Sequence, residues 1–260
     1  MKPRAPVSKR GGFQLARHAE RPPPAARARR ATADAGHGVR TAGAPPVTLI
    51  ALNKPYGVIC QFSRDGERRT LADFVAQPDV YPAGRLDTDS EGLLLLTNHG
   101  PLQHWISSPA AKSAAKFSSR SSAEGSDQHS NQPGRAQAHA LLKTYWVQVE
   151  GQLDDGAIAR LCAPLHLGDF VTADSVARRI PEPPGLWPRD PPIRYRAAIP
   201  TSWLEMTVGE GKNRQVRRMT AAVGYPTLRL IRAAIGPLRV DGLRLGASRN
   251  VSLAEIGYSG

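Results

Sequence analysis

Short runs of apolar residues, some continuous and some alternating with polar ones, recur along the chain from residue 47 onward. Continuous or alternating apolar runs of about four to eight residues predict β-strands. Strands are expected at 47–52, 58–62, 81–85, 93–97, 143–149, 170–180, 193–199, 203–208, 227–235 and 238–245, and short helices at 70–75, 102–106, 154–161 and 215–223. Strict strand–helix alternation is absent, so the pattern predicts an α+β fold with a mixed, mainly antiparallel sheet and short helices.

Two segments interrupt this pattern. Residues 1–46 are rich in Pro, Ala, Arg and Gly, and residues 110–140 are mostly Ala, Ser, Gln, Gly and His. Segments with so few large apolar residues cannot offset the entropy lost on ordering. We therefore expect a disordered basic tail at 1–46 and a catalytic domain at 47–250 with a disordered insertion at 110–140. Residues 251–260 are expected to form a C-terminal tail.

The formal net charge of the 260 residues is +13 and the calculated pI is about 10.4. Residues 1–44 hold ten Lys and Arg against Glu20 and Asp34, a net charge of +8. Such basicity indicates a polyanionic partner. No apolar run reaches the ~20 residues of a membrane-spanning helix, so nucleic acid is favoured over a membrane. The tail is either a solvated segment or a basic arm that adds RNA affinity.

The residue types that bind metals and cofactors follow no binding pattern. Cys60 and Cys162 lie far apart, which argues against a disulfide scaffold, and the seven histidines are scattered. The glycines of residues 209–219 (GEGKNRQVRRM) match neither a P-loop nor a dinucleotide-binding loop. We therefore expect neither a metal nor a cofactor.

An acidic segment lies between two predicted strands, in YPAGRLDTDSEGLLLLTNHG (residues 81–100). Arg85, Asp87, Asp89 and Glu91 precede four leucines that must be buried. A charged loop held between buried strands suits a catalytic group, but an ordinary acidic loop has the same composition. A calcium loop is disfavoured, because Asn98 stands where a bidentate Glu is needed. Paired carboxylates would also suit a glycoside hydrolase.

Two further segments carry candidate binding residues. Arg214, Arg217 and Arg218 lie on the turn before the predicted helix 215–223 and on its first turns, and their spacing places them on one face. There they would bind phosphates or neutralise a carboxylate, or would simply be solvated. Tyr145 and Trp146 are neighbours on a predicted strand, so their side chains point to opposite faces. At most one of them belongs to the core, and the other could stack on a base.

Together these segments resemble the family of ribosomal RNA pseudouridine synthases that includes the RsuA, RluB, RluE and RluF enzymes. The matching text is LNKPYGV (52–58), GRLDTDSEGLLLLTN (84–98), KTYWVQVEG (143–151) and EGKNRQVRRM with VGYPTLRLIRAAIG (210–236). With their flanks these motifs cover most of residues 47–246. Most members carry an amino-terminal S4 domain, for which residues 1–44 are too short, and this favours the E-type subgroup.

The resemblance implies a catalytic fold with a central active-site cleft and a role for each matching residue. Asp87 is implied to be the catalytic carboxylate, Tyr145 to guide or stack on the flipped base, and Arg217 to pair with Asp87. Arg85 would take the place of the flipped nucleotide. The remaining residues implied to contact RNA are Lys54, Lys212, Asn213, Arg214 and Arg218.

The implied activity is isomerisation of a uridine to pseudouridine in 23S ribosomal RNA, without a cofactor. The expected partner is this RNA or an assembling large ribosomal subunit, and the expected protein is a cytoplasmic monomer that binds no membrane. Two alternatives stay open: a synthase of the same family that acts on another ribosomal uridine, and a non-catalytic RNA-binding protein of ribosome assembly.

Overall fold

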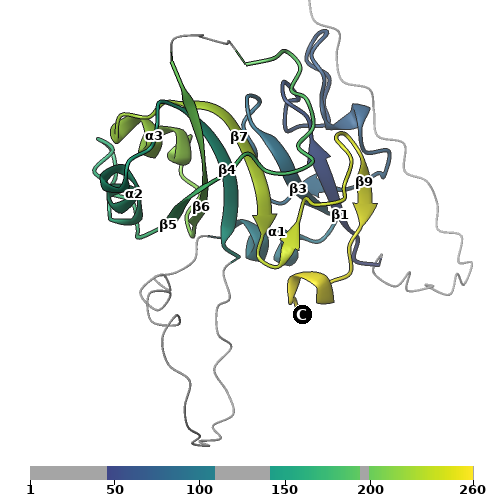
Figure 1. Ribbon diagram of the computed structural model, residues 1–260. Helices are drawn as coiled ribbons and strands as arrows, with labels where there is room; N and C mark the ends of the chain where they lie inside the picture. Colours follow the sequence, from purple (N-terminus) through teal and green to yellow (C-terminus); the bar gives the residue numbers. More distant parts are fainter. Residues whose placement is uncertain (1–45, 109–140, 194–198, 260) are drawn as a thin grey trace, which may run out of the picture. The chain divides into compact units, whose positions relative to one another are not determined.

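A single mixed sheet organises the part of the chain that the structure describes. The computed structural model describes residues 46–108, 141–193 and 199–259 (Figure 1). The predicted insertion at 110–140 and all of the predicted tail except Pro46 lie outside these residues. The strands are β1 (Leu49–Lys54), β2 (Tyr81–Pro82), β3 (Glu91–Thr97), β4 (Lys143–Glu150), β5 (Val176–Ile180), β6 (Thr201–Val208), β7 (Thr227–Ile235), β8 (Leu238–Arg239) and β9 (Ser248–Asn250).

The sheet runs in the order β5-β6-β4-β7-β3-β1-β9, with β2 paired to β3 and β8 paired to β7. The β3–β7 pair is parallel, whereas the other named pairs of the described residues are antiparallel. This confirms the predicted α+β class with a mixed, mainly antiparallel sheet.

Alternate residues of the strands feed two separate cores, one on each face of the sheet. Leu94 and Leu96 of β3 belong to the first core, with α2 (Asp155–Cys162) and α3 (Gln215–Ala222). Their neighbours Leu93 and Leu95 belong to the second core, with α1 (Gly100–Ser107). Because both faces of β3 are covered, all seven of its residues are buried, which explains its uninterrupted apolar run.

The short helices begin where polar side chains can cap them. The Asp154 carboxylate accepts a hydrogen bond from the Ala157 amide at 2.6 Å, and the His99 ring accepts one from the Leu102 amide at 3.3 Å. Such contacts satisfy amide groups that have no partner inside the helix. Predicted helices at 102–106, 154–161 and 215–223 are confirmed, and 70–75 contains the 3-10 turn Leu71–Asp73.

Several predicted strands are wrong or too long. Residues 58–62 form only one isolated bridge, from Ile59 to Thr70, and 170–180 contributes a strand only from Val176. Residues 81–85 and 238–245 shorten to two-residue strands. Most of 193–199 lies outside the described residues. Part of the expected C-terminal tail is packed, since Val251 and Ile256 are buried in the second core.

The parallel contact between β3 and β7 depends on Gly92. Gly92 lies opposite Arg232 with a φ of +101°, and a Cβ atom there would lie 2.4 Å from the Arg232 carbonyl oxygen. Any other residue would combine an unfavourable backbone conformation with a collision against backbone. Among the described residues, no helix is long and apolar enough to cross a membrane.

We therefore expect Gly92→Ala to lower the free energy of unfolding by at least about 3 kcal/mol, because strain and collision act together. Gly242→Ala is the matched control, since Gly242 also has a positive φ, +76°, but open space around its Cα. The control should lose only about 1 kcal/mol. Urea denaturation of both variants measures the difference, and equal losses would show that the close approach to Arg232 does not matter.

Candidate active site

The acidic segment borders two hollows that meet at Asp87. The first, about 220 Å³, is lined by residues 83–87 and 210–216 and by Lys143, Tyr145 and Arg232. The second, about 480 Å³, is lined by residues 56–57, 59–61, 85–89 and 213–214. Arg85, Asp87 and Arg214 line both hollows. Asp87 has a 37% exposed side chain, so its carboxylate is accessible to a bound molecule.

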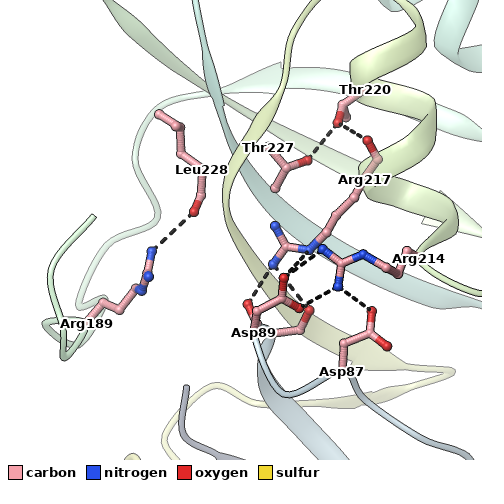
Figure 2. Close-up of polar contacts among 9 residues, drawn as sticks. Asp87, Asp89, Arg189, Arg214, Arg217, Thr220, Thr227 and Leu228 are labelled. Carbon is pink, nitrogen blue, oxygen red and sulfur yellow. Dashed lines mark hydrogen bonds and ion pairs between the residues drawn. The ribbon is translucent and has the colours of Figure 1, made fainter. Parts of the chain in front are cut away.

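Two arginines at the start of α3 hold the acidic loop (Figure 2). The Arg214 guanidinium donates to both carboxylate oxygens of Asp89, at 3.1 and 2.8 Å, and lies 3.9 Å from the Asp87 carboxylate. Arg217 donates to the Asp89 carbonyl oxygen at 2.6 Å, and its Nε lies 3.5 Å from the Asp89 carboxylate. The loop that carries Asp87 is thus fastened to the start of α3 through Asp89, two residues after Asp87.

This arrangement differs from the expected pairing. The sequence resemblance implied that Arg217 pairs with Asp87, but the arginine in ion-pair contact with Asp87 is Arg214. Arg217 is instead directed to the backbone and side chain of Asp89. The reason is geometric: Arg214 precedes the helix in a left-handed conformation, with a φ of +49°, which is an uncommon conformation that the surrounding contacts must maintain.

The turn that presents Arg214 is braced from within. Gln215 is buried, accepts a hydrogen bond from the Lys212 amide at 3.1 Å, and donates one to the Glu210 carboxylate at 2.8 Å. Val216, Met219 and Val223 anchor the helix in the first core. Both sets of contacts fix the first turn of α3, and with it the position of the two arginines.

Nearby charges and burial shift the pKa values of Asp89 and Arg217 in opposite directions. Burial tends to raise the pKa of Asp89, but the hydrogen bond from Arg214 and the charges of Arg217 and Arg214 outweigh it, so this pKa is below its usual value. Burial also lowers the pKa of Arg217, although the nearby Asp89 carboxylate opposes that change. Both arginines stay charged at neutral pH because an Arg pKa is so high.

Glu91, the third carboxylate of the acidic segment, is buried away from both hollows. It receives two hydrogen bonds from the buried Arg229, at 2.7 and 2.8 Å, and one from the Trp187 indole at 2.8 Å. The ion pair fastens β3 to β7 and holds the loop 181–192 over them. Glu91 therefore has a structural role, whereas Asp87 is left facing the hollows.

Tyr145 and Trp146 lie on opposite faces of β4, as expected. Trp146 packs in the second core, and Tyr145 packs in the first core while lining the smaller hollow. Tyr145 can therefore meet a ligand beside Asp87 in the smaller hollow, as Tyr56 can in the larger one.

The proposed RNA contact of Lys54 is contradicted by its burial. The Lys54 side chain is 0% exposed, and its Nζ donates to the carbonyl oxygens of Pro55 and Val58 at 3.0 and 2.9 Å. Burial lowers its pKa to about 8. Because β1 is covered on both faces, Lys54 shapes the turn that follows the strand and cannot reach RNA.

The other residues of the expected RNA-binding set differ in what they contact. Arg85, Lys212, Asn213 and Arg214 are exposed and line the smaller hollow. Arg218 is engaged by the 167–170 segment, since it donates to the Asp169 carboxylate and the Leu167 carbonyl oxygen and, like Lys212, lies over the Phe170 ring. The three arginines of this segment therefore do not act from one face, because Arg214 lies outside the regular helix.

Three residues that sequence reasoning did not assign also belong to the site. Asp89 looked like a second candidate carboxylate but is the anchor for Arg214 and Arg217. Lys143 and Arg232 line the smaller hollow although both are buried. A signal for Lys143 was present, since it lies two residues before Tyr145 and therefore on the same strand face. Arg232 stands in an apolar strand, which was a second signal.

Comparisons with known proteins identify relatives of this chain. A family model described as RNA pseudouridylate synthase matches residues 48–116. Ribosomal large subunit pseudouridine synthase E of Xanthomonas campestris pv. campestris is 48% identical over 203 residues, which cover 77% of this chain and 94% of that protein. The Vibrio vulnificus protein of the same name is 44% identical over 206 residues, which cover 79% of this chain and 75% of that protein.

A solved structure titled "Crystal structure of pseudouridylate synthase" shares the fold. It superposes with a TM-score of 0.56 at 24% identity and covers 81% of this chain and 73% of that one. The agreement supports the arrangement of the sheet and of the helices around it.

Replacing Asp89 tests how the loop is held. Asp89→Asn should lower the free energy of unfolding at pH 7 by no more than about 1 kcal/mol, because the ion pairs are partly exposed. Since the folded-state pKa of Asp89 is depressed, its contribution is present above the unfolded-state pKa of about 3.9 and is lost as the pH falls through the folded-state value. The difference in melting temperature between wild type and variant should therefore shrink below about pH 4. A difference that stays constant down to the acid limit would contradict this electrostatic account.

Proposed function

The chain belongs to the family of RNA pseudouridine synthases, and from this premise we propose that it converts a uridine of 23S ribosomal RNA to pseudouridine, with Asp87 as the catalytic carboxylate. The observation that carries the assignment of Asp87 is its position: an accessible carboxylate where two hollows meet, beside the Arg214 cation. The RNA is suggested by relatives named large subunit pseudouridine synthase E, at 44 to 48% identity.

The reaction requires a small set of groups. The bond between uracil N1 and the ribose C1′ breaks, the base turns, and C5 bonds to C1′. No atom is imported and no electron is gained or lost. The reaction therefore needs no more than a carboxylate, a pocket for the base and positive charge near the reacting groups. Asp87 is the group that would act on the ribose or the base, and the Arg214 guanidinium lies 3.9 Å from its carboxylate.

The target base must leave the RNA stack before the carboxylate can reach it. Extrusion costs a few kcal/mol, and contact between an aromatic ring and the base returns about 1–3 kcal/mol. We assign this contact to Tyr145, which lines the smaller hollow with Asp87. Arg85, exposed at the same hollow, is proposed to fill the space that the flipped nucleotide leaves in the RNA.

The exposed groups around the hollows are proposed to bind the RNA backbone. Lys212, Asn213 and Arg214 form a polar edge next to Arg85. Arg217 is proposed to position the loop that carries Asp87, because it donates a hydrogen bond to Asp89 and interacts with Asp87 only by long-range electrostatics. Arg218 is the weakest candidate of the set, since the 167–170 segment already occupies it.

The proposal also covers how the protein works as a unit. The residues that line both hollows fall within the proposed catalytic domain, residues 47–250, and we propose a monomer as the active form. A ribosomal RNA substrate would be met in the cytoplasm, either as free RNA or in an assembling large subunit.

Asp87→Asn should abolish pseudouridine formation while changing the dissociation constant for RNA less than about threefold, a difference below 1 kcal/mol. The amide keeps the shape of the side chain and removes its charge and its basicity. The measurement is carbodiimide mapping of pseudouridine on 23S and 16S ribosomal RNA transcripts incubated with each protein, with filter binding in parallel.

The outcomes of the mapping separate the alternatives. A single stop in 23S RNA that depends on Asp87 supports the full proposal, and a stop in 16S RNA keeps the chemistry while overturning the proposed substrate. If wild-type protein produced no stop on either RNA or on immature subunits but still bound them, a non-catalytic RNA-binding protein would be the better account.

A further inference from the structure

Two buried cations in the smaller hollow are incompletely satisfied. Lys143 is 7% exposed and Arg232 is 4% exposed. Within the described residues, Lys143 Nζ and Arg232 Nη2 are buried atoms without a hydrogen-bond partner. The other nitrogens of Arg232 do have partners, since Nε donates to the Leu93 carbonyl oxygen at 2.7 Å and Nη1 to that of Arg85 at 3.3 Å.

The sheet brings these two cations to the same wall as Tyr145. Lys143 and Tyr145 are two residues apart on β4, in a stretch whose pairing with β6 is regular, so they share one face. Arg232 is directly opposite Tyr145 on the neighbouring strand β7. The wall of the hollow, which Asp87 also lines, therefore carries an aromatic ring and two positive charges.

The contrast with Lys54 shows that burial alone does not explain this arrangement. Lys54 is also fully buried, but its ammonium group donates to two carbonyl oxygens. Lys143 gains no such compensation: burial first and the Arg232 charge second both lower its pKa, to about 8. A buried charge without a partner costs several kcal/mol, a cost that an anionic ligand in the hollow would offset.

We propose that Lys143 and Arg232 bind the uracil ring of the flipped nucleotide through its carbonyl oxygens and stabilise the negative charge that the ring carries during the reaction. This inference rests on the proposed function. When the N1–C1′ bond breaks, its electron pair stays with N1 and spreads over O2 and O4, while the electron-poor C1′ faces the Asp87 carboxylate. After rotation, C5 gives an electron pair to C1′. A base, the Asp87 carboxylate or water, takes the C5 proton, and N1 takes up a proton from water, so the protons balance.

The depth of the two cations favours the base over a phosphate. The cations at the edge of the hollow, on Arg85, Lys212 and Arg214, are exposed and suit the RNA backbone. Lys143 and Arg232 lie behind them beside Tyr145, where the ring that stacks on an aromatic face would enter. Preorganised donors aimed at developing charge are worth more in such a water-poor site than in solvent.

The first test separates chemistry from binding. Lys143→Met should slow the single-turnover rate about 100-fold, the usual loss for one such donor, while changing RNA affinity less than threefold. Its melting temperature should not fall, since the variant removes a buried unpartnered charge. Arg178→Met is the matched control, because it removes one exposed positive charge outside the hollow, and it should leave the rate unchanged.

The pH dependence gives a readout that a structural role would not move. If the protonated Lys143 is required, the wild-type rate should decline above about pH 8, the value to which burial lowers its pKa. Lys143→Arg stays charged, so it should recover most of the rate and lose this decline. Other titratable or charged groups line the same hollow, so the pH profiles of their variants serve as references for the Lys143 profile. These groups are Arg232, Tyr145, Asp87, Arg85, Glu210, Lys212 and Arg214.

A change of substrate distinguishes the base from its phosphate. Replacing either phosphate that flanks the target uridine with a neutral methylphosphonate should leave the 100-fold effect of Lys143→Met intact. If the effect disappeared with one of these substrates, Lys143 would bind that phosphate and the inference would be wrong. It would also be wrong if Lys143→Met matched the wild-type rate, a result that leaves the proposed function standing. Absence of pseudouridine with wild-type protein would instead reject the proposed function itself.

Discussion

The site depends on the attachment of the acidic loop to the first turn of α3. Arg214 binds the Asp89 carboxylate with two hydrogen bonds, and Arg217 binds the backbone of the same residue. Asp87 is two residues away and needs only one of these cations, Arg214, at 3.9 Å. The charges that hold the loop and the charge that supports Asp87 are therefore largely the same, so position and electrostatics of the carboxylate are set together.

The sheet supplies the frame for this attachment. The parallel contact of β3 with β7, which requires the absence of a side chain at Gly92, brings the acidic loop next to Arg232. The buried pair of Glu91 and Arg229 fastens the same two strands. From β7 the pairing continues to β4, which presents Tyr145 and Lys143 to the hollow. Carboxylate, aromatic ring and buried cations thus come from separate parts of the chain that two strand pairings bring together.

Long-range geometry accounts for most of what the sequence could not predict. The fold class, the three helices and the long strands follow from apolar periodicity, and the motifs around Asp87, Tyr145 and Arg214 identified the residues that line the hollows. Burial of Lys54 could not be predicted, because a lysine next to a turn is usually exposed and its partners are carbonyl oxygens of the folded turn. The exchange of roles between Arg214 and Arg217 also escaped prediction, since it follows from the left-handed conformation of Arg214 before the helix.

The most direct test of this account is a double-mutant cycle between Asp89 and Arg214, read as the single-turnover rate of pseudouridine formation. If the ion pair between these two side chains fastens the loop that carries Asp87, Asp89→Asn and Arg214→Met should each slow the reaction. Combining them should slow it no more than the worse single change, because removing either partner already breaks the pair. Additive losses, with the double variant slowed by the product of the two factors, would show that the residues act independently and would contradict the account.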